Sequence, residues 1–150
     1  SSALLWIVPT KSSFQVDLDW DLYFAPRNRP YREHQYIGIF HDGAVRAVGR
    51  EELVVDVEGD TRNPVLVSGR EPGQEEIRRI EGALEDAWAR FGWDIDSGYR
   101  FFLVDGFRET TFIPAGEIDV PRYLELADWI PRVPTRTERL ALELAGRRWR

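Results

Sequence analysis

The alternation of apolar and polar positions divides the chain into short strands and a few helices. The apolar run Ala3–Val8 stops at Pro9, which is typical of a strand buried on both faces. Between residues 14 and 24, apolar side chains partly alternate with three aspartates, which predicts a half-buried extended segment. Two prolines interrupt residues 25–34, so this stretch is predicted to be a loop.

Two Asp-Gly pairs predict β-hairpins, because Asp-Gly supplies the positive φ angles that a tight hairpin turn needs. Asp42-Gly43 follows the apolar run 36–40 and precedes a returning strand. Asp105-Gly106 stands in the same way between residues 99–104 and 107–113. With residues 53–57, these runs predict roughly five to seven short strands.

The clearest helix is predicted over residues 74–91. Pro72 precedes it, two glutamates occupy its first turn, where they complement the helix dipole, and Gly92 stands at its C-terminal end. Steps of three and four residues separate its large apolar side chains. The side chains expected to face the core include Ile77, Ile80, Leu84 and Trp88.

Two further helices are expected near the C-terminus. One runs from Pro121 to Ile130, and the last is capped by Thr135 or Thr137. The predicted fold class is α+β: a small, mostly antiparallel β-barrel with peripheral helices. A length of 150 residues suits one domain, so residues 1–150 are predicted to form a single domain.

The composition is that of a globular chain, with 43% hydrophobic and 31% charged residues. No apolar run approaches the roughly 18 residues that a membrane span needs, so no membrane partner is expected. The lack of cysteine excludes disulfides, thiolate metal sites and cysteine nucleophiles, and we expect a cytoplasmic protein. Because methionine is also absent, we expect the domain to come from a larger multidomain chain whose other domains are partners.

The net charge of −6 is unevenly distributed. Residues 1–50 hold six basic and five acidic residues, whereas residues 51–100 hold six and thirteen. A local basic face can therefore coexist with an acidic middle. Nineteen of the twenty basic residues are Arg, which suits phosphate binding, although a GC-rich genome produces the same bias.

No catalytic or metal-binding motif stands out. His34 and His41 match no metal-ligand spacing. Asp17, Asp19 and Asp21 suit a hard cation if they share a strand face, but they equally suit a solvent face, which we favour. We therefore expect no enzyme, no catalytic residue, no metal site and no cofactor.

Several short motifs, mainly in residues 3–60, occur in a recognisable order. The chain resembles the PUA-like superfamily, and within it the EVE and YTH domains, which are small β-barrels that read modified bases. The shared features are a first strand with Trp6, then Lys11-Ser12, Trp20-Asp21, Arg27-Asn28 and the turn Phe40-His41-Asp42-Gly43.

The resemblance implies a pocket that holds one base, stacked on an aromatic ring and hydrogen-bonded along its edge. Residues 10–36 contain aromatic rings, small polar groups, Lys11 and three arginines for such a site. Trp20 and Tyr36 are equally expected to be ordinary core residues. The candidate nucleic-acid-binding residues are Ser12, Ser13, Trp20, Tyr23, Arg27, Asn28, Arg29, Arg32 and Tyr36.

The expected function is therefore a nucleic-acid-binding module, for modified DNA or RNA, of a prokaryotic restriction, antiviral defence or RNA-handling protein. The alternative is a protein-interaction or scaffolding domain that presents an acidic helix and the aromatics Trp93, Trp129 and Trp149. A third reading is a hydrolase whose site is completed by another domain.

Overall fold

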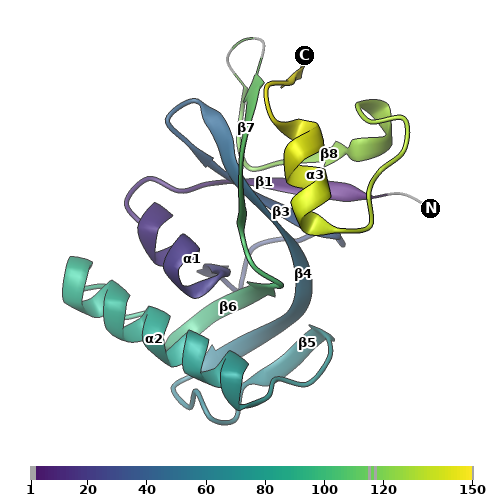
Figure 1. Cartoon of the computed structure of the whole chain (residues 1–150). Coiled ribbons are helices and arrows are strands. Elements are labelled where there is room, and N and C mark those ends of the chain that lie inside the picture. The colour runs from purple at the N-terminus through teal and green to yellow at the C-terminus, as the bar shows by residue number, and fades with distance from the viewer. Residues whose placement is uncertain (1–2, 115, 117, 150) are drawn as a thin grey trace. The chain divides into compact units, whose positions relative to one another are not determined.

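A computed structural model describes residues 3–114, 116 and 118–149 of the chain. These residues form a mixed α+β structure with nine strands and three α-helices (Figure 1). The strands form an open sheet, so the predicted closure into a barrel is not confirmed. The chain divides into two compact units, which we call unit 1 (residues 1–12, 32–50 and 106–150) and unit 2 (residues 13–31 and 51–105).

Unit 1 contains strands in the hydrogen-bonded order β8-β1-β3-β4-β7-β9, with the first part of β4. The pair β1–β3 is parallel and places Pro9 opposite Phe40, so the carboxyl ends of both strands meet at the same edge. The bounds are β1 Leu4–Pro9, β3 Tyr36–His41, β4 Ala44–Glu58, β7 Arg108–Pro114, β8 Arg122–Glu125 and β9 Arg148–Trp149.

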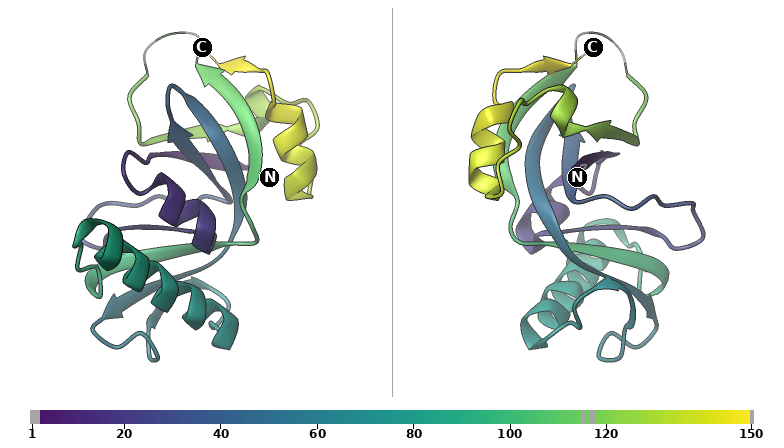
Figure 2. Two further views of the ribbon diagram at one scale, coloured as in Figure 1. Left: turned by 60° about the vertical axis from the view of Figure 1, so that its left-hand side comes forward. Right: turned by 90° about the vertical axis from the view of Figure 1, so that its right-hand side faces the viewer.

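The core of unit 1 forms because β1, β3 and β4 are apolar and helix α3 (Thr137–Leu144) covers β7 (Figure 2). Trp149 is fully buried against Phe112, with ring centroids 4.7 Å apart. The scaffolding alternative requires Trp149 to be exposed, and this expectation is wrong. The larger members of this core include Leu5, Ile7, Tyr36, Val45, Val48, Phe112, Leu124, Leu140, Leu144 and Trp149.

One of the two predicted hairpins is confirmed. Asp42 and Gly43 have φ angles of 48° and 78° and connect β3 to β4. The hairpin predicted at Asp105-Gly106 is wrong, because the strands on either side of it pair with β4 instead of with each other.

Unit 2 contains strands in the order β2-β6-β4-β5, with the second part of β4. Two helices lie side by side against this sheet (Figure 1). The bounds are α1 Phe14–Trp20, β2 Leu22–Pro26, β5 Val65–Gly69, α2 Gln74–Phe91 and β6 Ser97–Val104.

The predicted extended segment over residues 14–24 is wrong. Residues 14–20 are helical, Asp21 ends the helix with a φ of 51°, and only then does β2 begin. Val16 and Asp17 face the interior while Asp19 is exposed. The three aspartates therefore do not form one strand face, whether for a cation or for solvent.

Helix α2 has the predicted bounds but a shifted inner face. Its buried residues are Glu76, Ile80, Ala83 and Ala87, whereas Trp88 is 63% exposed. Glu76 is retained inside because its Oε1 accepts the N–H of Gly73 at 2.7 Å. This bond holds the pKa of Glu76 below its usual value.

The C-terminal predictions are also corrected. The helix expected over residues 121–130 is β8 followed by a 3₁₀ turn, Leu126–Asp128. Helix α3 begins at Thr137, so Thr137 is its first residue and Arg136 occupies the N-cap position. Within the described residues, no helix is long and apolar enough to cross a membrane.

Candidate functional site

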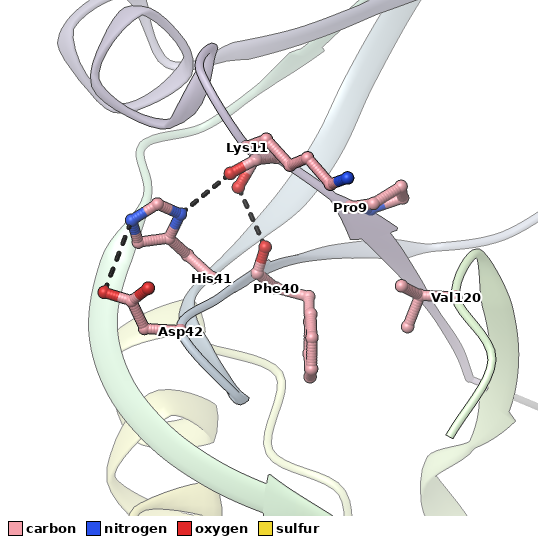
Figure 3. Close-up of a pocket in the computed structure, with 7 residues that line it drawn as sticks. Pro9, Lys11, Phe40, His41, Asp42 and Val120 are labelled. Atoms are coloured by element: carbon pink, nitrogen blue, oxygen red, sulfur yellow. Dashed lines mark hydrogen bonds and ion pairs between the residues drawn. The ribbon is translucent and has the colours of Figure 1, made fainter. Parts of the chain in front are cut away.

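A pocket of about 430 Å³ opens in unit 1 at the carboxyl ends of β1 and β3 (Figure 3). Figure 3 shows Phe40 and Val120 projecting from different segments, with the Lys11 side chain alongside Pro9. The lining residues are Pro9, Thr10, Lys11, Phe40, His41, Asp42 and Val120.

The parallel register of β1 and β3 explains why these residues meet, because it sets Pro9 opposite Phe40. Hydrogen bonds then join the chain after each strand. The N–H and Oγ1 of Thr10 both donate to the carbonyl of Phe40, at 3.2 and 2.9 Å. The Nδ1 of His41 lies 2.8 Å from the carbonyl of Thr10. These bonds fix the mouth of the pocket before any ligand arrives.

The imidazole of His41 has a defined orientation. A carbonyl only accepts hydrogen bonds, so Nδ1 must carry the proton that it donates to Thr10. Its Nε2 lies 3.6 Å from the carboxylate of Asp42. Arg46 braces the same turn by donating to the carbonyls of His41 and Asp42, at 2.9 and 2.6 Å. The hairpin turn, which forms one wall of the pocket, is therefore held by several hydrogen bonds.

The pocket combines an aromatic ring, apolar surface, one cation and the carboxylate of Asp42. Phe40 is half-buried, packs partly against the core of unit 1 and lines the pocket, and Val120 adds apolar surface. Lys11 is exposed and is the single lysine of the sequence. A flat ring that carries a nearby negative group suits this combination.

Charge distinguishes the two units. Unit 1 has twelve basic and nine acidic residues, a net charge of +3, whereas unit 2 has eight and seventeen, a net charge of −9. Because a local field decides where an anion gathers, phosphate is expected to prefer unit 1.

The residues predicted to form a base pocket are divided between the units. Ser12, Arg32 and Tyr36 belong to unit 1, and the other six belong to unit 2. The structure therefore does not describe one site that contains them all. The six candidate residues that belong to unit 2 are Ser13, Trp20, Tyr23, Arg27, Asn28 and Arg29.

The three predicted aromatic residues serve packing. Tyr23 packs near Phe102 and is 7% exposed, and Tyr36 is 5% exposed within the core of unit 1. The indole N–H of Trp20 donates to Asp86 at 3.0 Å, and its ring lies on Gly82 of α2. With the two tyrosines buried and Trp20 packed on a helix, we do not place a base on these rings.

The predicted polar residues have varied environments. The hydroxyl of Ser13 donates to Asp17 at 3.1 Å, and Arg27 forms an ion pair with Glu58 at 2.8 Å. Arg32 lies 4.9 Å from the ring centre of Tyr123 and remains exposed. The remaining candidates, Ser12, Asn28 and Arg29, are exposed.

The residue-level prediction missed the members of this pocket as a group. The sequence indicates Lys11 as a phosphate-binding cation and residues 40–43 as a turn that includes His41, but it does not join the two. The pattern Phe-His-Asp-Gly was a usable signal, because a hairpin turn places its flanking side chains at a strand end. Val120 lies outside any motif, so no sequence pattern indicated that it lines the pocket.

Comparisons with family models, curated proteins and solved structures found no match. Among the described residues, no group of three or more His, Cys, Asp or Glu side chains is placed to hold a metal ion.

Proposed function

We propose that the chain is a nucleic-acid-binding module that holds one unpaired or flipped base in the pocket of unit 1. The observation that supports this proposal is the meeting of two motifs. Lys11 of Lys11-Ser12 and three residues of Phe40-His41-Asp42-Gly43 line the same pocket, although about thirty residues separate these two PUA-like motifs.

The chemistry of the pocket fits a base. The ring of Phe40 offers a stacking surface, and stacking contributes about 1–3 kcal/mol per base. The ammonium group of Lys11, which is exposed and lines the pocket, would attract an adjoining phosphate. Because His41 is held by Thr10 and Arg46 braces the turn, little ordering is needed on binding.

The charge of unit 1 favours the same ligand. A nucleic acid approaching the chain is attracted by a net charge of +3 in unit 1 and repelled by −9 in unit 2. We therefore assign the phosphate contacts to Lys11 and other cations of unit 1, in place of Arg27 and Arg29 of unit 2.

A PUA-like module that reads a modified base would direct a restriction, defence or RNA-handling protein to its target. It would act by binding alone, without a catalytic step of its own.

The test is a fluorescence-anisotropy titration of labelled oligonucleotides, both single strands and duplexes. Each is prepared unmodified, with 5-methylcytosine and with 5-hydroxymethylcytosine. We expect dissociation constants below about 100 micromolar at low salt. Phe40→Ala should weaken binding roughly fivefold to a hundredfold and remove any preference among bases.

Lys11 provides an independent variant. Lys11→Ala should weaken all oligonucleotides alike and reduce the salt slope by about one, while Lys11→Arg should retain binding. Arg62→Ala, which removes an exposed cation of unit 2, is the matched control. No binding below about 100 micromolar, or full binding by a folded Phe40→Ala variant, would contradict the proposal.

A further inference from the structure

Unit 2 carries an apolar groove of about 390 Å³ at the C-terminal end of helix α2. It contains the side chains of two tryptophans and is edged by three carboxylates. The residues that line it are Leu84, Glu85, Trp88, Trp93, Asp94, Ile95 and Asp96.

The local sequence builds this groove by ending the helix abruptly. Gly92 adopts a φ of 67°, and the N–H of Trp93 then bonds back to the carbonyl of Ala87 at 3.3 Å. This turn sets the ring of Trp93 against Phe91, with centroids 4.4 Å apart. Ile95 is 3% exposed and joins the groove to the core of unit 2.

The two indoles are exposed beyond what folding requires. Trp88 is 63% exposed and Trp93 is 38% exposed. Helix α2 buries its core face through Ile80, Ala83 and Ala87, so Trp88 is not needed there. Large apolar side chains grouped in an open groove are typical of an interaction surface.

The charge around the groove is strongly negative. Residues 80–99 include five acidic residues and one basic residue, Arg90. Arg90 forms ion pairs with Asp86 and Asp19, at 2.9 and 3.4 Å. A hydrogen bond and charge repulsion from Asp94 raise the pKa of Asp96 above its ordinary value. A cation bound beside these two carboxylates would relieve that repulsion.

We infer that this groove binds a basic peptide segment of a partner protein. A Lys or Arg side chain would lay its alkyl stem along the apolar floor and its charge over an indole face. Tryptophan is the strongest aromatic partner for a cation, and the carboxylates of Glu85, Asp94 and Asp96 would complete the site. This inference does not depend on the base pocket of unit 1.

The experiment uses the whole chain and a fluorescein-labelled peptide of alternating Arg and Ala. Fluorescence anisotropy measures the binding of the peptide. A peptide of alternating Glu and Ala is the charge-reversed comparison. We expect the basic peptide alone to bind. Trp88→Ala should weaken it about fivefold, Trp88→Phe should weaken it less, and Asp94→Asn with Asp96→Asn should weaken it similarly.

The matched controls are in the same unit. Val65→Ala removes an exposed apolar side chain, since Val65 is 60% exposed, and Glu71→Gln removes an exposed charge. Neither should change the affinity. Equal binding of the acidic peptide would overturn the inference. The inference would also be overturned if Glu71→Gln weakened binding of the basic peptide as much as Asp94→Asn with Asp96→Asn. The attraction would then be unspecific.

Discussion

The carboxyl group of Asp17 lies in the interior of unit 2. Its Oδ2 accepts a hydrogen bond from Ser13 at 3.1 Å, and its Oδ1 has no hydrogen-bond partner among the described residues. Burial raises the pKa of Asp17 well above its usual value, against the opposing effect of the Ser13 hydroxyl. The protonated form is therefore favoured inside the folded protein relative to the unfolded chain.

The sign of the resulting pH dependence follows. In the unfolded chain the Asp17 carboxyl loses its proton above its ordinary pKa of 3.8, whereas in the folded protein it keeps the proton to higher pH. The free energy of unfolding therefore falls as pH rises. Asp17→Asn removes the ionisable carboxyl and with it the pH-dependent loss of stability. The free energy of unfolding of the variant, relative to that of the natural chain, should therefore increase from pH 4 towards pH 7. Urea unfolding at a series of pH values measures it. Asp19→Asn, at an exposed position of the same helix, is the control, and a pH-independent difference would contradict the assignment.

Such residue-level detail was only partly accessible from the sequence. The spacing of Asp17, Asp19 and Asp21 fits a strand face, yet α1 is a seven-residue helix. A helix this short is stabilised mainly by packing on a neighbour, so its local pattern is ambiguous. Tyr23 and Tyr36 illustrate the same limit, because an aromatic residue has the same sequence signal in a core and in a pocket.

Helices α1 and α2 approach closely at Gly82. A Cβ added at Gly82 would lie 2.3 Å from the ring of Trp20, so a glycine is required there. Alanine normally stabilises a helix interior by about 1 kcal/mol relative to glycine. Gly82→Ala should instead destabilise unit 2 by about 1–3 kcal/mol, because the overpacked ring must move.

A double-mutant cycle checks this explanation. In the Trp20→Ala background, the same Gly82→Ala change should become neutral or stabilising by about 1 kcal/mol. Ala89→Gly, at an exposed position of α2, calibrates the propensity effect. Urea unfolding of the four combinations gives the coupling energy. A destabilisation by Gly82→Ala that persists without the Trp20 ring would show that another contact is responsible.

Elements with local signals were predicted best. The bounds of α2 follow from Pro72, two early glutamates and Gly92, all of which act within one turn of the helix ends. The turn at Asp42-Gly43 is likewise local. The pairing of β6 and β7 with β4 is not, because it joins distant segments, and the Asp105-Gly106 hairpin was therefore mispredicted.

At the scale of the whole molecule, the net charge of −6 conceals a division into +3 and −9. Counting along the chain revealed an acidic middle, but the two units are each built from separated segments. The candidate site has the same origin, since Lys11 and Phe40 meet only through the parallel pairing of β1 with β3. Parallel strands are not joined by a tight turn, so no local sequence signal marks their pairing.

This division predicts that the two proposed ligands depend on different residues of one chain. Lys11→Ala should weaken oligonucleotides and leave the basic peptide unchanged, whereas Trp88→Ala should do the opposite. Leu142→Ala, which truncates a 68% exposed side chain of unit 1 outside the pocket lining, should change neither.

Anisotropy titrations of both labelled ligands against the three variants measure this pattern at one salt concentration. Because the pocket lining lies wholly in unit 1 and the groove lining wholly in unit 2, each loss should be selective. Loss of both ligands in either variant would contradict the separation of the sites. If the unaltered chain binds the basic peptide but no oligonucleotide, the base pocket is rejected and the groove of α2 is retained, because the groove rests on Trp88, Trp93 and the neighbouring carboxylates.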